Sequence, residues 1–380
     1  MKPNCIIIHY AEIALKGKNR SYFEKLLIKN CEKKLGSLAT NIFQDMSHIV
    51  VETKETEKAS DILKKIPGIA YFSPAVKCKL DLEELKKQSI AMLKNKKFST
   101  FKISAKRRKK ESPFDSMELN NKLGQEVVDK LKKKAKMESP DMDLKVEIAN
   151  HFAYLSLEDI KGVGGFPTDP RQKVVTLLSG GFDSPVAAYM MMKRGCEVLL
   201  VHFQNKNTLT KSVQDKIERL ATQLSKFQIK TKLFIVHFED IQKEIIKKVK
   251  AEQRMLIYRK VMLKIAAEIA NQHKARFLVT GDSISQVASQ TLDNLQAVYA
   301  ESPLQVLTPL IGFDKQEIIN LADKIGTGEI SKEPYGDCCS YFVPQHPELR
   351  AKSADLKAAE ENLSYDIRST IKNSAVFEYK

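Results

Sequence analysis

The sequence contains few cysteines, no long apolar run and no low-complexity tract. No apolar stretch approaches the ~20 residues of a membrane-spanning helix, and the short apolar run ending at His9 does not form a secretory signal. We therefore expect a cytoplasmic protein with reduced thiols and no membrane partner. The six cysteines show no spacing typical of a disulfide framework: Cys5, Cys31, Cys78, Cys196, Cys338 and Cys339.

Among the charged residues, acidic ones are fewer than basic ones. The 380 residues include 63 Lys and Arg against 47 Asp and Glu, which gives a formal net charge of +16. This excess is larger than solubility requires and favours a polyanionic partner, with nucleic acid the first candidate. A lysine-rich composition without functional meaning is the alternative. The length and the 43% hydrophobic content predict two or three globular domains.

The N-terminal part of the chain alternates short apolar runs with amphipathic ones, which predicts α+β structure. The residues from Gly162 to Pro167 then interrupt every periodicity and mark a domain boundary. The expected strands lie at residues 5–9, 49–51, 70–76, 100–104, 144–148 and 153–157, and the expected helices at 20–35, 59–65, 82–93 and 116–134.

Strand and helix patterns alternate after Lys173, which predicts a doubly wound parallel sheet. In such a sheet ligands bind at the carboxyl ends of the strands, where Ser179, His202 with Phe203, and Gly281 all fall. We therefore expect these positions to share one nucleotide-binding crevice. The expected strands are 174–178, 197–203, 231–237 and 277–280, and the expected helices are 185–194, 212–226 and 251–272.

The most informative motif is Ser-Gly-Gly-Phe-Asp-Ser at residues 179–184, between an apolar run and an apolar-rich helix pattern. Glycines allow close approach of a ligand to the backbone, and the unpaired N–H groups of a helix start favour an anion. The motif is not a common P-loop, because no Lys follows Gly181 before the helix. It resembles the PP-loop of ATP pyrophosphatases; a purely structural glycine turn is the alternative.

The whole chain resembles the tRNA 4-thiouridine synthetases, the ThiI family. The resemblance rests on blocks in family order at residues 11–20, 101–108, 177–186, 280–291 and 334–339. It implies a ferredoxin-like domain at residues 1–60, a tRNA-binding THUMP domain at 61–165, and a PP-loop ATP pyrophosphatase domain at 166–380. It also implies ATP with Mg²⁺, and conversion of the uridine at position 8 of tRNA into 4-thiouridine with release of AMP and pyrophosphate.

The resemblance implies a set of ATP contacts, several of which have a plainer structural reading. His202 can cap the sheet, the side chains of Leu177 and Leu178 belong to the core, and Arg259 stands on a basic helix face that is solvated by default. Asp183 either orients the loop or Mg²⁺, or acts as a carboxylate at the helix start. The contacts implied by the resemblance are Leu177, Leu178, His202, Phe203, Arg259, Gly281 and Gln290. Backbone and hydroxyl donors for the phosphates are expected from Ser179, Gly180, Gly181 and Ser184.

The densest basic cluster lies within the THUMP-like segment and predicts phosphate contacts with tRNA. The neighbouring Phe98 and Phe101 are expected in the core, because they flank a predicted strand. The basic residues assigned to RNA are Lys102, Lys106, Arg107, Arg108, Lys109 and Lys110.

The adjacent Cys338 and Cys339 are the predicted sulfur-carrying residues. One thiol, Cys338 by gap-free matching or Cys339 by a shift of one, would carry a persulfide, and the second would release the sulfur. Two buried thiols or metal ligands are the alternative. We expect no rhodanese relay, and Met255 and Tyr258 stand where some relatives have the Cys-x-x-Cys of an iron–sulfur cluster. The expected donor is therefore a separate cysteine desulfurase.

Two other functions stay open at this point. One is sulfur transfer to a small sulfur-carrier protein for thiamine thiazole synthesis, which some family members support. The other is a tRNA-binding protein without activity, against which the intact motif at residues 179–184 argues. Family members often act as homodimers, but no segment of the sequence identifies an interface.

Overall fold

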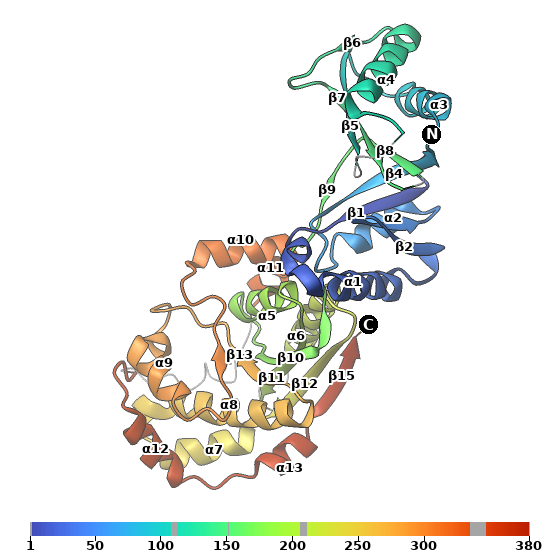
Figure 1. Cartoon of the computed structure of the whole chain (residues 1–380). Coiled ribbons are helices and arrows are strands. Elements are labelled where there is room, and N and C mark those ends of the chain that lie inside the picture. Colours follow the sequence, from blue (N-terminus) through green and yellow to red (C-terminus); the bar gives the residue numbers. More distant parts are fainter. Residues whose placement is uncertain (1, 108–112, 151, 206–210, 335–346, 380) are drawn as a thin grey trace. The chain divides into compact units, whose positions relative to one another are not determined.

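The computed structural model describes residues 2–107, 113–150, 152–205, 211–334 and 347–379, without the side chains of 211–213. The chain divides into two compact units, Met1–Pro167 and Thr168–Lys380, and each is considered by itself (Figure 1). Within the described residues, no helix is both long and apolar enough to cross a bilayer.

The N-terminal unit is built on one nine-stranded sheet with the order β2-β3-β1-β4-β8-β7-β5-β6, and β9 pairs with β4. The pairing is antiparallel except where β5 runs parallel to β6 and β7. The strands are β1 (Cys5–His9), β2 (Asn41–Asp45), β3 (His48–Glu52), β4 (Tyr71–Lys79), β5 (Thr100–Arg107), β6 (Lys134–Ala135), β7 (Met142–Ile148), β8 (Phe152–Ser156) and β9 (Ile160–Lys161).

Alternation along the strands divides the N-terminal unit into separate cores. Ile6 and Ile8 of β1 face a core with α1 and α2, whereas Cys5 and Ile7 face a smaller cluster on the opposite side of the sheet. A third core packs α3 and α4 against β5. The helices are η1 (Glu12–Asn19), α1 (Arg20–Leu35), η2 (Gly36–Leu38), α2 (Thr56–Leu63), α3 (Leu82–Leu93) and α4 (Ser116–Leu131).

The C-terminal unit contains a six-stranded sheet with the order β14-β13-β10-β11-β12-β15. Its strands are parallel except β15, which pairs with β12 in the antiparallel sense. The predicted doubly wound sheet is therefore confirmed, with one antiparallel edge strand of a kind common in such sheets. The strands are β10 (Asp169–Leu177), β11 (Cys196–Gln204), β12 (Thr231–His237), β13 (Phe277–Val279), β14 (Val306–Leu307) and β15 (Ala375–Tyr379).

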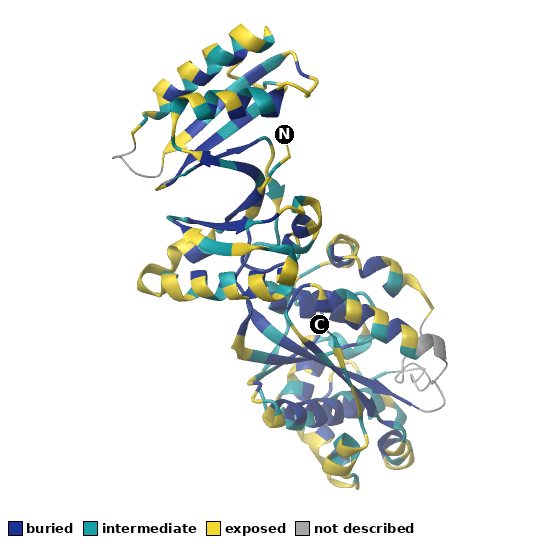
Figure 2. Ribbon diagram, turned by 90° about the vertical axis from the view of Figure 1, so that its right-hand side faces the viewer, coloured by how far each residue is buried: buried dark blue, intermediate teal, exposed yellow. Residues whose placement is uncertain are grey.

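Helices cover both faces of this sheet, with α5 and α6 on one side and α7 and α8 on the other (Figure 1). The central strands are buried almost throughout (Figure 2). The helices are α5 (Asp183–Lys193), α6 (Lys211–Ser225), α7 (Glu239–Lys248), η4 (Ala251–Gln253), α8 (Arg254–Gln272), η5 (Ala288–Gln290), α9 (Leu292–Tyr299), α10 (Lys315–Ile325), α11 (Gly328–Lys332), α12 (Ser353–Glu361) and α13 (Ile367–Lys372).

Candidate functional site

The glycine motif lies at the point where the strand order reverses. The chain moves from β10 to β11 and β12 in one direction, and then returns to β13 on the other side of β10. The loop after β10 and the loop after β13 therefore lie at the same edge of the sheet, at the switch point where doubly wound sheets bind nucleotides. The sequence expectation that these strand ends share an edge is met by the parallel pairing of Thr176 with Val279.

The two serines of the motif hold the loop together. The Ser179 backbone N–H donates to Ser184 Oγ over 2.7 Å, and the two hydroxyl oxygens lie 3.0 Å apart. The Ser179 N–H is therefore engaged within the loop. An added Cβ at Gly181 would meet Ser179 Oγ at 3.7 Å, an ordinary contact, so the space beside this glycine is open to a ligand.

Gly281 brings the loop after β13 against the start of α5. A Cβ at this position would lie 2.7 Å from Ser184 N, 2.8 Å from Asp183 C and 3.0 Å from Asp183 Cβ. These neighbours are backbone or directly attached to it, so they cannot rotate away. Only glycine permits this close approach.

Asp183 is the first residue of α5, where a carboxylate interacts favourably with the helix dipole. Its Oδ1 accepts from Lys315 Nζ over 2.7 Å and its Oδ2 accepts from Gln286 Nε2 over 2.9 Å. Lys315 Nζ also lies 5.6 Å from the centre of the Phe182 ring. Sequence reasoning missed Lys315, because a lysine at the start of α10 carries no signal that places it beside a loop 132 residues earlier.

Arg259 forms a largely buried ion pair with Asp282, the residue that follows Gly281 in the loop after β13. Arg259 Nη2 lies 2.5 Å from Asp282 Oδ2, and Arg259 Nη1 donates to the Ser289 carbonyl over 2.9 Å. The local expectation of a solvated basic face is wrong, because the Arg259 side chain is only 15% exposed and the neighbouring Tyr258 and Lys260 are buried. The Arg259 guanidinium compensates the charge of the buried Asp282 carboxylate.

Several donors converge on the Asp282 carboxylate. Burial alone would raise the pKa of Asp282, but Arg259 and hydrogen bonds from Tyr299, Thr280 and Gln290 outweigh burial and hold this pKa below its usual range. Gln290 Nε2 donates to Asp282 Oδ1 over 2.9 Å. Gln290 Oε1 is buried and accepts no hydrogen bond from the described part of the chain, so it can accept one from a ligand N–H or O–H.

The remaining predicted ATP contacts are core residues at the strand ends. His202 Nδ1 lies 2.9 Å from the Leu178 carbonyl, and the His202 ring is buried. The Phe203 ring packs edge-on against Phe238 at 5.6 Å between centroids. Leu177 packs against the same core. Any ligand contact at these positions would therefore use the backbone.

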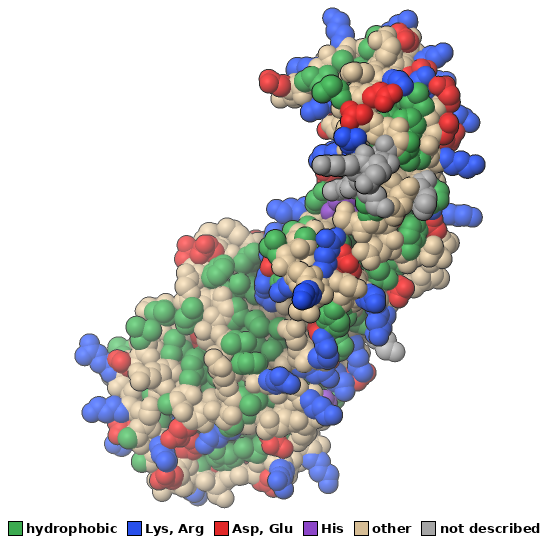
Figure 3. Space-filling model, in the orientation of Figure 1, with side chains coloured by type: hydrophobic (Ala, Val, Ile, Leu, Met, Phe, Trp, Pro, Cys, Tyr) green, Lys and Arg blue, Asp and Glu red, His purple; other side chains and the backbone are tan. Residues whose placement is uncertain are grey.

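The described part of the predicted RNA cluster lies on β5. Phe101, Ile103 and Ala105 face the core, while Lys102 and Lys106 lie on the other face of the strand. Arg107 pairs with Asp115 at 3.2 Å. Phe98 and Phe101 are buried, so their predicted core position is confirmed. Figure 3 shows Lys and Arg side chains spread over the visible face of the N-terminal unit.

Five predicted functional residues lie outside the described residues: Arg108, Lys109, Lys110, Cys338 and Cys339. The other four cysteines are buried free thiols, as expected of packing residues. Burial raises the pKa of Cys5 and of Cys31 to about 12. Thiols of this kind are poor nucleophiles at neutral pH.

Within the described residues, three buried side chains of the N-terminal unit have the chemistry of metal ligands: His9, His48 and Glu147. His9 Nε2 and His48 Nε2 lie 3.2 Å and 3.0 Å from different oxygens of the Glu147 carboxylate. Each imidazole forms an ion pair with the carboxylate when it is protonated. The group connects β1 and β3 with β7.

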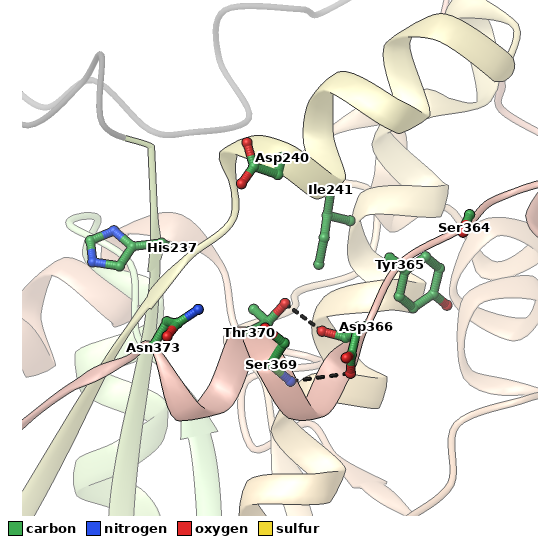
Figure 4. Close-up of a pocket in the computed structure, with 9 residues that line it drawn as sticks. All are labelled: His237, Asp240, Ile241, Ser364, Tyr365, Asp366, Ser369, Thr370 and Asn373. Carbon is green, nitrogen blue, oxygen red and sulfur yellow. Dashed lines mark hydrogen bonds between the residues drawn. The ribbon is translucent and has the colours of Figure 1, made fainter.

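A polar cavity of about 520 Å³ lies in the C-terminal unit, at the end of β12 and the start of α13. Figure 4 shows its lining, in which Asp366 accepts from the backbone N–H of Ser369. With two carboxylates and no Lys or Arg in its wall, this cavity does not suit a phosphate. It is lined by His237, Asp240, Ile241, Ser364, Tyr365, Asp366, Ser369, Thr370 and Asn373.

A glycine-serine loop at the switch point of a doubly wound sheet, with Lys315 bound to its Asp183 and Arg259 bound to Asp282 of the loop after β13, defines a nucleotide-binding domain of the PP-loop class. Family comparison agrees with this class. The thiamine biosynthesis protein family, ThiI, matches residues 170–365, the ThiI ferredoxin-like domain matches 5–73, and the THUMP domain matches 79–158. The chain belongs to the ThiI family.

Individual relatives match over nearly the whole chain. A probable tRNA sulfurtransferase of Caldanaerobacter subterraneus subsp. tengcongensis is 42% identical over 95% of both chains, and one of Thermoanaerobacter pseudethanolicus is 41% identical over the same shares. The crystal structure of a 4-thiouridine synthetase–RNA complex with bound ATP superposes with a TM-score of 0.91, 33% identity and 100% coverage of both chains. PH1313 from Pyrococcus horikoshii shares the fold, with a TM-score of 0.66, 22% identity and coverage of 85% of this chain and 99% of the other.

Proposed function

We propose that this protein is an ATP-dependent tRNA sulfurtransferase that converts a uridine, at position 8 of tRNA, into 4-thiouridine. The similarity to the 4-thiouridine synthetase that binds RNA and ATP, which extends over the entire chain, is the observation that carries this proposal. The relatives named as probable tRNA sulfurtransferases support the same reaction class.

The first step activates the uracil ring. The uridine O4 attacks the α-phosphorus of ATP, the bond to the β-phosphate oxygen breaks, and pyrophosphate leaves. The motif at residues 179–184 would hold the phosphates through the N–H groups at the start of α5. Lys315 would offset negative charge that develops on the phosphates, and Gln290 would accept a hydrogen bond from the nucleoside.

Mg²⁺ would bind to the ATP phosphates and neutralise part of their charge. Asp183 fits a ligand role, because its carboxylate lies at the loop and its side chain is 22% exposed. Asp282 does not fit, since its oxygens already accept from four donors: Arg259, Thr280, Tyr299 and Gln290.

The second step replaces oxygen by sulfur. The terminal sulfur of a persulfide on Cys338 or Cys339 attacks the activated carbon, and AMP leaves with the former O4. The thiol of the other cysteine then attacks the inner sulfur, so that the thiocarbonyl stays on the base and a disulfide forms between the two cysteines. A dithiol reductant restores both thiols, and a cysteine desulfurase supplies the next persulfide sulfur.

The N-terminal unit would bind the tRNA. We assign the ferredoxin-like domain to residues 1–60, the THUMP domain to 61–165 and the PP-loop domain to 166–380; the first boundary falls within α2. Lys102 and Lys106 on β5, together with Arg107 and the basic residues 108–110, would contact phosphates. We also propose cytoplasmic location, because tRNA and a desulfurase must both be present.

Reconstitution with purified tRNA, ATP, Mg²⁺, cysteine and a cysteine desulfurase tests the proposed function. Nucleoside mass spectrometry should detect 4-thiouridine only when all components are present, with one pyrophosphate released for each modified base. Cys338→Ser and Cys339→Ser proteins should each lose thiolation. Full 4-thiouridine formation by both variants would exclude the persulfide route.

A second candidate is sulfur transfer to a small sulfur-carrier protein, which the family description as a thiamine biosynthesis protein favours. The same reconstitution with such a carrier in place of tRNA would give a C-terminal thiocarboxylate, visible as a 16 Da mass increase. Carrier thiocarboxylate without any 4-thiouridine would make this the main activity.

A further inference from the structure

A buried lysine on α6 supports the chain segment that leads to the cysteine pair. Lys216 is only 2% exposed, and its ammonium group donates to the backbone carbonyls of Ser331 over 3.1 Å and Glu333 over 2.7 Å. Buried lysines are rare unless their charge is compensated. Here the ammonium caps the C-terminal end of α11, where carbonyl groups lack helical partners and the helix dipole favours a cation.

The same segment contacts the glycine motif. The Ser331 hydroxyl donates to the Gly181 carbonyl over 3.1 Å, while the Ser331 carbonyl accepts from Lys216. One residue of α11 therefore connects the buried ammonium of α6 with the loop assigned to ATP. This connection fixes the position of α11 relative to the motif within the C-terminal unit.

The anchored carbonyls stand close in sequence to the predicted sulfur carriers. Cys338 follows Glu333 by five residues, a length that spans at most about 17 Å. The position of the Glu333 carbonyl therefore limits where the cysteine sulfur can be placed. Arg219 adds a two-pronged ion pair with the Glu333 carboxylate at 2.7 Å and 2.8 Å, but both side chains are exposed, so this pair holds the segment less firmly.

We propose that Lys216 is a positioning residue for sulfur transfer, which fixes the start of the cysteine-bearing segment so that the persulfide reaches the activated uridine. This inference rests on the proposed function. Lys216 acts through the backbone carbonyls of Ser331 and Glu333. The hydrogen bond from the Ser331 hydroxyl to the Gly181 carbonyl does not involve Lys216 and keeps α11 on the motif, so removal of Lys216 should impair the sulfur-transfer step more than the activation step.

Lys216→Met removes the ammonium group and keeps an apolar stem of similar length in the buried site. A displacement of a reacting group by about 1 Å can slow a reaction by up to ~100-fold. We therefore expect the yield of 4-thiouridine per pyrophosphate released to fall at least about fivefold in this variant. Pyrophosphate release per folded enzyme should stay within about twofold of the wild-type rate.

The experiment uses the full-length protein, loaded by a cysteine desulfurase and checked by mass spectrometry for equal persulfide content. Pyrophosphate and 4-thiouridine are then measured in a single turnover with tRNA and ATP. Lys226→Met is the matched control, because Lys226 is an exposed lysine directly after the same helix. Its ratio of 4-thiouridine to pyrophosphate should equal that of the wild type.

The ratio of 4-thiouridine to pyrophosphate distinguishes a positioning role of Lys216 from simple destabilisation of the protein. A loss of folded protein lowers both products together, so an unchanged ratio in Lys216→Met would overturn the proposal whatever the total activity. If that protein does not fold, Lys216→Gln, which keeps a neutral NH2 donor group, should give an intermediate ratio, and a wild-type ratio in this variant would equally refute the proposal. The Cys338→Ser and Cys339→Ser proteins run in parallel: full thiolation by both would reject the persulfide route itself, independently of Lys216.

Discussion

Replacing Gly281 by alanine would place a methyl group against the first residues of α5. The new carbon would lie 2.7 Å from Ser184 N and 2.8 Å from Asp183 C, well inside van der Waals contact with backbone that cannot rotate away. The strain can be relieved only if the loop after β13 and the glycine motif move apart. Both are walls of the proposed ATP site, so the substitution should affect stability and nucleotide binding together.

The expected magnitude follows from the energetics of overpacking. Inserting a methyl group into a well-packed position costs about 1–3 kcal/mol. For a folding unit the size of Thr168–Lys380, this corresponds to a fall in Tm of about 2–12 °C, at ~2–4 °C per kcal/mol. If the same free energy is lost from ATP binding, Kd rises about 5- to 150-fold.

Thermal unfolding and equilibrium ATP binding of the full-length variant measure these two quantities. Gly312→Ala is the matched control, since a Cβ at Gly312 would have no neighbour within 4 Å; its Tm and ATP affinity should stay at wild-type values. Unchanged Tm and unchanged ATP affinity in Gly281→Ala would show that the close approach of the two loops is not required, and the reasoning would be refuted.

Three further predictions concern single charged residues. Lys315→Met should lower the rate of tRNA-dependent pyrophosphate release about 10- to 100-fold, since it removes a cation beside the motif. Because the ion pair of Lys315 is exposed, Tm should barely change. A fall in Tm alongside the loss of rate would contradict a role of Lys315 in catalysis alone. Burial raises the pKa of Glu147, but His48 and His9 outweigh burial and hold this pKa far below its usual range. Its carboxylate therefore stabilises the fold above the unfolded-state pKa of about 4.3 and loses this contribution as pH falls below that value. Glu147→Gln should lower the free energy of unfolding by about 3 kcal/mol at pH 7. Denaturant titrations should show that this difference between variant and wild type becomes smaller below pH ~4. A difference that does not change with pH would show that ionisation of Glu147 does not contribute to stability. Lys106→Ala should weaken tRNA binding at all sequences and reduce the slope of log K against log salt by about one, as measured by filter binding at several salt concentrations; an unchanged slope would remove Lys106 from the phosphate contacts.

Local patterns were sufficient to predict most regular elements. The apolar run at residues 5–9 and the helical pattern at 20–35 agree with β1 and α1, because these segments carry both the hydrophobic pattern and the breaks that define an element. Several elements were not anticipated, among them β15. Its five residues are mostly exposed at the sheet edge, so they lack the buried apolar pattern that marks a central strand.

The sequence by itself determined the class of this protein. The motif at residues 179–184, its strand and its helix pattern are contiguous, so their chemistry follows from short-range order. Which side chains surround the motif depends on contacts between distant segments, and these only the tertiary structure decided. Asp183 forms an ion pair with Lys315, which lies 132 residues further along the chain. Arg259 pairs with Asp282 instead of lying on a solvated helix face. Gly281 is required because the first residues of α5 lie directly against it. Long-range packing and charge compensation in the interior have no local signature, which is the physical reason for this division.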